Sequence, residues 1–239
     1  MKSKPFPPDC EKSVDYPGSM SAKHDIPKTG YEVILKRDPK AKALHIIASR
    51  QPLSDLMKSF KAGDSIEPRN SNGDTPFHVA AHMGRSRDFV TFFLRNRANV
   101  NAKNNHGDTP LHLYLMNKSI TRKEQLAIIY LVANSGADLE LQNGLLLTPL
   151  AVAVKENIHE AIGLLVKAGA RMDTLSGPEN LSALHLAVTF KKNQSVQALI
   201  KNGARLDARD LDGYTPFQVA CSLGYYDIAR ILIAAEPKP

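Results

Sequence analysis

Histidine is the residue type that first suggests chemistry in this 239-residue chain, which contains eight of them. An imidazole can ligate a metal ion or exchange a proton near neutral pH. Four of the eight follow a similar short phrase, and each is separated from the next by 33 or more residues. These four are His45, His78, His112 and His185. Because such spacing places each one in a different structural unit, we expect that they cannot converge on one ion.

The chain lacks the other sequence patterns of catalysis. It has no Gly-rich phosphate loop, no G-x-S-x-G and no H-E-x-x-H. Its two cysteines, Cys10 and Cys221, provide neither a disulfide framework nor zinc-ligand spacing. Cys221 stands among small apolar residues, so we expect a buried and inert side chain. We therefore predict a protein that is not an enzyme, with no catalytic residue, metal site, cofactor or small-molecule substrate.

Composition narrows the range of partners. The chain is 43% hydrophobic and 23% charged, as is ordinary for soluble globular proteins. The net charge of +7 is spread without a dense basic run or interleaved aromatic residues, which argues against nucleic-acid binding. No apolar stretch approaches the ~20 residues of a membrane-spanning helix, and the first 30 residues lack the apolar centre of a secretory signal peptide. We expect a cytoplasmic or other intracellular location.

A recurring four-residue phrase predicts the helices that carry the four repeated histidines. Residues 75–78 read Thr-Pro-Phe-His, and related phrases begin near residues 42, 109, 148, 182 and 215. Thr75 suits a helix N-cap, Pro76 suits the first helical position, and Asn72-Gly73 suits a tight turn. A second marker, Gly-Ala or a variant of it, recurs in phase, for example at residues 136–137, 169–170 and 203–204.

A period near 33 residues with a T-P-L-H-x-A phrase resembles the ankyrin-repeat family. The resemblance covers roughly residues 40–236. It implies an all-α solenoid of about six helix-turn-helix repeats joined by β-hairpin-like turns, in which neighbouring repeats complete each other's core. It also implies that the repeated histidines bond the cap Thr or Ser and nearby backbone instead of a metal.

The sequence divides into four segments. Residues 1–29 contain five prolines among polar residues, and we expect a disordered or extended arm there. Residues 30–41 form a degenerate N-terminal capping segment, in which Tyr31, Val33 and Leu35 would cover the end of the repeats. Residues 42–236 are the repeats, and residues 237–239 are a tail.

Three repeats depart from the pattern. The third is longer around residues 117–120, which predicts a longer inner helix or a protruding loop, either a binding feature or a tolerated insertion. The fourth has three leucines, residues 145–147, at its turn tip, where they are either functional or folded back on their neighbours. The last keeps the apolar run Ile231-Leu232-Ile233, which predicts that either the array was cut from a longer one or its end docks, for example by self-association through this C-terminal repeat.

By resemblance, a protein or peptide partner would bind in the concave groove, which turn tips and inner-helix ends line. The turn tips offer Asn72, Asp74, Asn105, His106, Asp108, Leu145, Leu147, Leu181, Leu211 and Tyr214. The inner-helix ends offer His82, Met83, Met116, Lys155, Glu156, Thr189, Phe190, Ser222 and Leu223. The early repeats are polar and would steer the partner, whereas the later ones are more apolar and would grip it.

The leading hypothesis is a non-enzymatic protein-protein interaction scaffold. One alternative is the target-recruiting module of a larger enzyme or effector, and another is a nucleic-acid or membrane-surface binder, which only the net charge favours. The Lys- and Asn-rich texture without Trp is similar to that of ankyrin effectors of intracellular bacteria, which would place the protein in the host cytosol.

Deleting residues 1–38 should lower the melting temperature, because the apolar side chains of Tyr31, Val33 and Leu35 would no longer cover the first repeat. Thermal denaturation followed by circular dichroism measures the change. An unchanged melting temperature would refute the covering role.

Overall fold

A computed structural model describes residues 39–60 and 64–236, with the backbone alone for residues 39–43. The expected arm, Tyr31, Val33, Leu35 and the tail lie outside the described residues. The described residues up to Pro149 belong to one compact unit, and the described residues from Leu150 onwards belong to a second. We call them the N-terminal unit and the C-terminal unit and describe each by itself.

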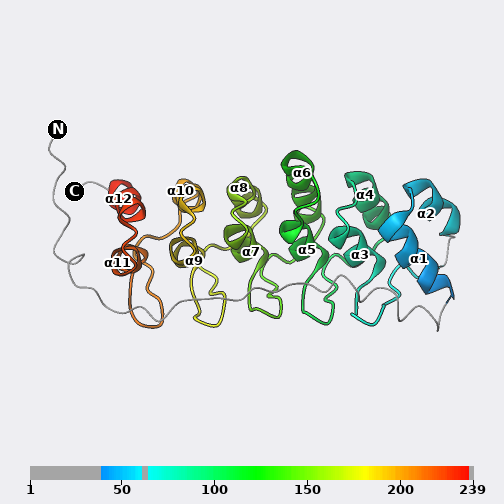
Figure 1. Cartoon of the computed structure of the whole chain (residues 1–239), viewed down its shortest axis with the longest axis horizontal. Coiled ribbons are helices and arrows are strands. Elements are labelled where there is room, and N and C mark those ends of the chain that lie inside the picture. The colour runs from blue at the N-terminus through cyan, green and yellow to red at the C-terminus, as the bar shows by residue number, and fades with distance from the viewer. Residues whose placement is uncertain (1–38, 61–63, 237–239) are drawn as a thin grey trace. The chain divides into compact units, whose positions relative to one another are not determined.

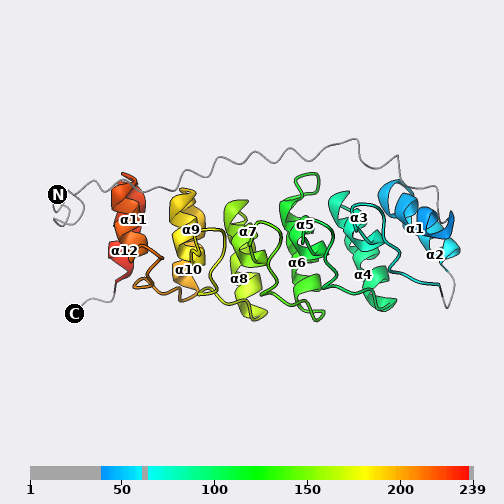
Figure 2. The same cartoon turned by 90° about the horizontal axis from the view of Figure 1, so that it is seen from below.

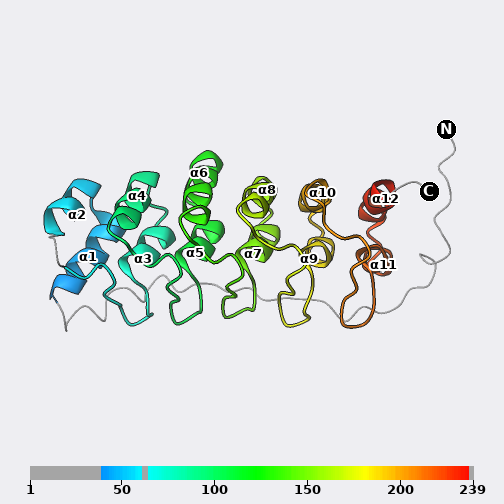
Figure 3. The same cartoon turned by 180° about the vertical axis from the view of Figure 1, so that it is seen from behind.

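The N-terminal unit consists of three helix pairs. The inner helices are α1 (Pro39–Arg50), α3 (Pro76–His82) and α5 (Pro110–Met116), and the outer helices are α2 (Leu53–Ser59), α4 (Arg87–Arg95) and α6 (Arg122–Ala133). Helix α3 packs between α1 and α5, and α4 packs on α6. Figures 1 and 3 show the two rows, with the connecting hairpins reaching to one side of the helices.

The C-terminal unit repeats this arrangement. Its inner helices are α7 (Pro149–Lys155), α9 (Ala183–Thr189) and α11 (Pro216–Ser222), and its outer helices are α8 (His159–Lys167), α10 (Asn193–Lys201) and α12 (Tyr226–Ala235). Helix α9 packs on α11, and α10 lies between α8 and α12 (Figure 2). The described residues thus form six helix pairs and no β-strand, which confirms the expected all-α repeat architecture.

Helix boundaries follow local chemistry. Pro76, Pro110 and Pro216 occupy first helical positions, where a missing N–H costs nothing. Helix α1 begins at Pro39, inside the segment expected to cap the repeats, because proline also suits this first position. Cys221 is buried on α11, as expected.

The repeated histidines connect successive repeats. The Nδ1 of His78 accepts hydrogen bonds from the hydroxyl (2.8 Å) and N–H (3.2 Å) of Thr75. Its Nε2 donates to the carbonyl oxygen of Asp108 in the following hairpin, at 3.0 Å. The same Nε2 bond to the next hairpin joins His45 to Asp74 (2.9 Å), His112 to Leu147 (3.0 Å) and His185 to Tyr214 (2.9 Å).

We call this interaction the histidine bridge, since one ring holds its own helix start and the next repeat's backbone. The resemblance implied the bond to the cap residue, and the structure adds the bond to the next hairpin. Position 151, the equivalent place in the fourth repeat, holds alanine, whose methyl group cannot form such a bridge. In the sixth repeat Gln218 takes the histidine's capping role, and its Oε1 accepts from the N–H of Thr215 at 2.9 Å.

An aromatic cluster fills the core between the second and third repeats. The rings of Phe77 and Phe93 stack with centroids 5.1 Å apart, and Phe77 meets Tyr114 edge-on at 6.5 Å. Tyr114 is fully buried, and its hydroxyl donates to the carbonyl oxygen of Arg85 at 3.2 Å. These contacts supply the apolar surface that one helix pair cannot bury alone.

The histidine bridge requires a neutral ring, because Nδ1 accepts a hydrogen bond while Nε2 donates one. Burial lowers the pKa of His78 and His185 below the usual value, and burial lowers the pKa of His112 to about 4. A buried imidazole therefore resists protonation in the folded state.

The free energy of unfolding should consequently fall as pH drops from about 6.5, the pKa of an unfolded-chain histidine, towards about 4, where folded His112 protonates. In that window the unfolded chain binds more protons, so this stabilisation is complete above the window and lost through it. Each histidine contributes a slope of at most about 1.4 kcal/mol per pH unit. Urea denaturation at a series of pH values measures the slope.

The matched variant is His112→Gln, because glutamine occupies the equivalent place in the sixth repeat but does not titrate. The variant's slope should be shallower than the wild-type slope between pH 6.5 and 4.5, and the difference isolates His112 from the carboxyl groups. Identical slopes would contradict the assignment.

Candidate partner-binding surface

Four of the hairpins between repeats are each folded by one side chain at the start of the hairpin. The Oδ1 of Asn70 accepts from the N–H groups of Asn72 and Asp74, both at 2.9 Å. The same two bonds, at 2.8 to 3.1 Å, recur in three other hairpins, where the acceptors are Asn104, Asn143 and Asp210. These are Asx turns, which shape the backbone without help from a partner.

In the N-terminal unit the hairpins are also joined to one another. The N–H of Asn105 donates to the carbonyl oxygen of Asn72 at 2.9 Å, and the N–H of Gly144 donates to that of His106 at 2.7 Å. Lys103 adds a third link, because its Nζ donates to the carbonyl oxygen of Gln142 at 2.7 Å. The hairpins at residues 70–74, 104–108 and 143–147 therefore form a connected array, which we call the hairpin array.

Two acidic residues expected on the binding surface belong to this array instead. The carboxylate of Asp74 accepts from Asn104 Nδ2 at 2.8 Å, and that of Asp108 accepts from Asn143 Nδ2 at 2.8 Å. Both aspartates are buried, and burial raises the pKa of Asp108, while the bond from Asn143 opposes that rise. Their role is to hold neighbouring hairpins, since their carboxylates are already occupied.

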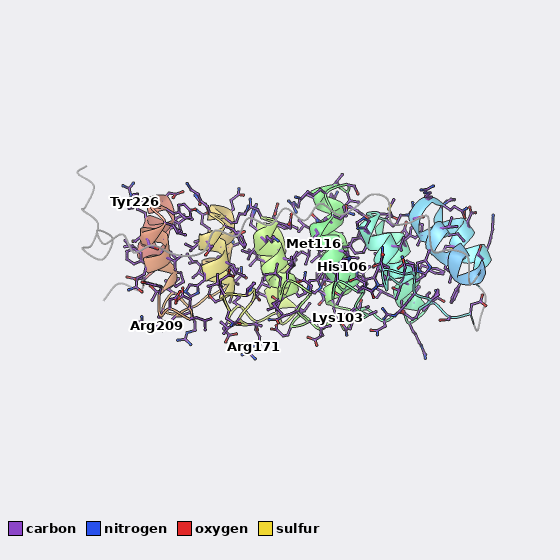
Figure 4. The ribbon with its side chains drawn as sticks, turned by 60° about the horizontal axis from the view of Figure 1, so that its bottom comes forward. Lys103, His106, Met116, Arg171, Arg209 and Tyr226 are labelled. Carbon is purple, nitrogen blue, oxygen red and sulfur yellow. The ribbon has the colours of Figure 1, made fainter. Side chains whose placement is uncertain are left out.

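The other groove residues that the sequence predicted in the N-terminal unit are at least partly exposed to solvent. Met83 is 42% exposed, Asn105 and His106 are exposed, and the remainder are half-buried, namely Asn72, His82 and Met116. Figure 4, turned so that the hairpin side comes forward, shows His106 between Met116 and Lys103 in this view. The accessible set is thus mainly polar, with two flexible methionines that adapt to varied partners.

The three leucines of the fourth hairpin divide between the two roles that the sequence left open. Leu147 is buried at 5% exposure, so we remove it from the binding surface. Leu145 and Leu146 remain 37% and 47% exposed. Leu146 has a φ of 58°, where the neighbouring hairpins have Gly73 and Gly107, and this conformation costs a branched residue about 1–2 kcal/mol. The sequence marked Leu146 and its two neighbours as a candidate site because a leucine stands at a glycine position, but the expected groove residues included only Leu145 and Leu147 of the three.

In the C-terminal unit the expected residues are mostly accessible. Leu211 is 69% exposed, and half-buried positions are Lys155, Glu156, Thr189, Phe190, Tyr214, Ser222 and Leu223. Leu181 is the exception, with 3% exposure. Its backbone N–H and C=O pair with those of Ser176 at 2.9 Å, and this closed hairpin turns the leucine inward.

Basic residues beside the hairpins of this unit are already engaged. Arg171 pairs with Asp173 at 3.3 Å, Arg205 pairs with Asp207 at 3.1 Å, and the Nη1 of Arg209 donates to the carbonyl oxygen of Gly213 at 2.7 Å. Figure 4 shows Arg171 and Arg209 on the hairpin side, away from Tyr226. Such pairing reduces the positive potential that phosphate binding would need.

Side-chain hydrogen bonds join the longer third repeat to the second repeat. The expectation of a longer inner helix was wrong, since α5 has seven residues like α3, and α6 is the long helix with 12. Asn117 Nδ2 donates to the carbonyl oxygens of Ala81 (3.0 Å) and His82 (2.7 Å), and Glu124 Oε1 accepts from the N–H of Arg87 at 2.8 Å. Asn117 of the insertion thus caps the end of α3, and Glu124 in the first turn of α6 caps the start of α4.

Comparison with known proteins identifies the repeats. A profile described as "Ankyrin repeats (3 copies)" matches residues 115–210 and 150–239, and one described as "Ankyrin repeats (many copies)" matches residues 61–113. The chain belongs to the ankyrin-repeat family. Ankyrin repeats are generally protein-protein interaction modules and are typically non-enzymatic.

Ankyrin proteins similar to this chain come from several animals. It is 30% identical over 81% of its length to a transient receptor potential cation channel subfamily A member 1 homolog of Caenorhabditis elegans, covering 15% of that protein. It is 40% identical over 34% of its length to protein phosphatase 1 regulatory subunit 27 of Mus musculus, covering 53% of it. The nuclear factor NF-kappa-B p105 subunit of Gallus gallus is 28% identical over 78% of this chain, which covers 19% of that protein.

The chain therefore spans less than two thirds of the length of each of these ankyrin relatives. Within residues 39–60 and 64–236, no three His, Cys, Asp or Glu side chains gather as a metal ion would require. In the same residues, no helix has the length and apolar character to cross a bilayer. A bacterial origin stays a prediction.

Replacing Asn104 by alanine should destabilise the ankyrin repeats by about 1–3 kcal/mol, because two backbone N–H groups and the buried Asp74 carboxylate each lose a partner. Urea denaturation measures the loss.

Its neighbour Asn105 supplies the control, since the side chain of Asn105 is exposed and donates only to the carbonyl oxygen of Ser71, at 2.8 Å. The substitution Asn105→Ala should cost less than about 1 kcal/mol. Equal losses for the two variants would show that Asn104 does not organise the hairpin array.

Proposed function

We propose that the chain is a non-enzymatic scaffold that binds a segment of a partner protein along its hairpin tips and inner-helix ends. The observation that carries this proposal is that internal hydrogen bonds already shape the hairpins. Because Asn70, Asn104, Asn143 and Asp210 shape the tips in advance, binding a partner requires little ordering of the backbone. Exposed tip side chains such as His106 and Leu211 are then left for recognition.

The two units offer different chemistry to a partner. The C-terminal unit presents Phe190, Leu211, Tyr214 and Leu223. Tyrosine is enriched among the few residues that supply most of the energy in interfaces, and the other three side chains add apolar area around it. The N-terminal unit presents mainly Asn72, Asn105 and His106, which suit hydrogen bonding and orientation. We propose that the surface of the C-terminal unit grips the partner and that of the N-terminal unit steers it.

The relatives support a role in assemblies. Two of them are named as subunits, a regulatory subunit of protein phosphatase 1 and the p105 subunit of nuclear factor NF-kappa-B. This chain covers only 15% and 19% of two of its relatives, so similar repeats there form part of a larger protein. That observation favours a second candidate function, in which the repeats bind a target protein on behalf of a larger enzyme or effector. An intracellular location is part of both proposals.

Double substitution of Phe190 and Tyr214 by alanine should abolish partner binding and leave the circular dichroism spectrum intact, because both side chains are only half-buried. The measurement is a pull-down from cell lysate with quantitative mass spectrometry, comparing the wild type with this variant.

A matched control is the double variant Tyr226→Ala and Ile233→Ala, which removes an exposed aromatic and an exposed aliphatic side chain from α12. The control should retain the proteins that the Phe190 and Tyr214 variant loses. Retention of every captured protein by the Phe190 and Tyr214 variant would place the binding site elsewhere.

A further inference from the structure

Helix α6 differs from the other outer helices in its sequence. Residues 126–133 read Leu-Ala-Ile-Ile-Tyr-Leu-Val-Ala, eight apolar residues in succession. An outer helix needs one apolar stripe towards the inner helices and a polar face towards solvent. When the repeats are aligned on the Gly-Ala marker or its variant, the position of Tyr130 in α6 corresponds to Thr91 in α4 and to Gln197 in α10. Both of these equivalents are polar.

Only one face of α6 is used by the core. Ile128, Ile129 and Val132 are fully buried. Tyr130 is 58% exposed, and Leu126 and Ala127 are half-buried beside it. Residues spaced three and four apart lie on the same side of a helix, so Leu126, Ala127 and Tyr130 form one outward patch. We call these three residues the α6 patch.

Basic residues flank the α6 patch. Arg122 and Lys123 are exposed in its first turn, and Arg87 and Arg95 are exposed at the two ends of α4, which packs beside α6 in Figures 1 and 3. Within the described part of the chain, Arg87, Arg95 and Lys123 form no ion pair.

Nearby acidic groups do not balance this charge. Asp88 is exposed on α4 and the carboxylate of Glu124 accepts from the backbone N–H of Arg87 at 2.8 Å, so two negative groups face four positive ones and the rim keeps a net positive charge. An apolar centre containing tyrosine within a charged rim is the usual composition of a protein-binding site.

We propose that the α6 patch and its basic rim form a second docking surface, which binds an acidic segment of a partner protein carrying an aliphatic or aromatic anchor. The anchor would pack on Tyr130 and Leu126, and acidic residues of the segment would face Lys123 and Arg87 by charge complementarity. A symmetric contact between two copies through this patch is disfavoured, because two basic rims would repel each other.

This surface is separate from the one proposed above. The α6 patch lies on an outer helix, whereas the hairpin tips and inner-helix ends lie on other elements of the N-terminal unit. The two surfaces can therefore be tested independently.

The test uses a fluorescein-labelled peptide with Leu and Phe at helical spacing and Glu elsewhere, titrated with the full chain and followed by fluorescence anisotropy. A second peptide has Lys in place of every Glu. The Glu peptide should bind, more weakly at higher salt, and Tyr130→Ala should weaken its binding at least about tenfold. The double variant Arg87→Glu and Lys123→Glu should weaken it as well, whereas the Lys peptide should not bind the wild type.

Three controls make the test specific. Tyr226→Ala removes a tyrosine that is 50% exposed on another outer helix and should leave binding unchanged. Tyr130→Phe keeps the ring and should bind like the wild type. The Phe190 and Tyr214 double variant should also bind normally. Circular dichroism melts confirm that each variant is folded.

Several outcomes would overturn the proposal: no binding of the Glu peptide, equal binding of the Lys peptide, or unchanged binding by Tyr130→Ala. Binding that depends on Phe190 and Tyr214 but not on Tyr130 would place the peptide on the other surface, leaving the proposed function intact. Duplex DNA provides a further check. If the chain binds DNA in a salt-dependent way, keeps that binding in Tyr130→Ala and does not bind the Glu peptide, the basic rim binds polyanions and the proposed acidic protein segment is wrong.

Discussion

The histidine bridge determines how the repeats are held together. A cap residue such as Thr75 would hold only its own helix, but His78 carries the hydrogen-bond chain onwards to the carbonyl oxygen of Asp108 in the next hairpin. Each bond contributes only about 0.5–1.5 kcal/mol. Because the ring is buried, however, losing a partner leaves an unsatisfied nitrogen, and the bridge specifies where the next hairpin must lie. Apolar packing, as between Phe77 and Tyr114, then supplies the larger energy.

The bridges and the hairpin array separate the residues that build the surface from those that can recognise a partner. Three polar residues lie close to the tips, namely Asp74, Asp108 and Asn104. Their side chains are already engaged in hydrogen bonds within and between the hairpins. Their neighbour His106 is exposed, since the array uses only its backbone. A rigid backbone with interchangeable outer side chains allows one fold to serve many partners.

The repeat architecture could be predicted because its signals are local, namely a cap threonine and a proline at the start of most inner helices and a glycine after most outer ones. The surface was harder to predict, since burial at a tip depends on residues far away in sequence. In the sequence Asp108 has no evident partner, but Asn143, 35 residues later, pairs with it. Leu181 turns inward because its backbone pairs with Ser176. The exposure of Tyr130 could not be predicted from its apolar run, which is typical of a core helix. The packing of α6 on α5 and α4 shows which face is left outside.

The alanine at position 151 has a consequence for how the ankyrin array comes apart. In a linear array, folding is cooperative only as far as each interface between neighbours is strong. The fourth repeat lacks the ring that would hold the fifth hairpin, and that hairpin closes on itself through Ser176 and Leu181. We expect denaturation to proceed in stages, with the last two repeats melting as a block distinct from those before them.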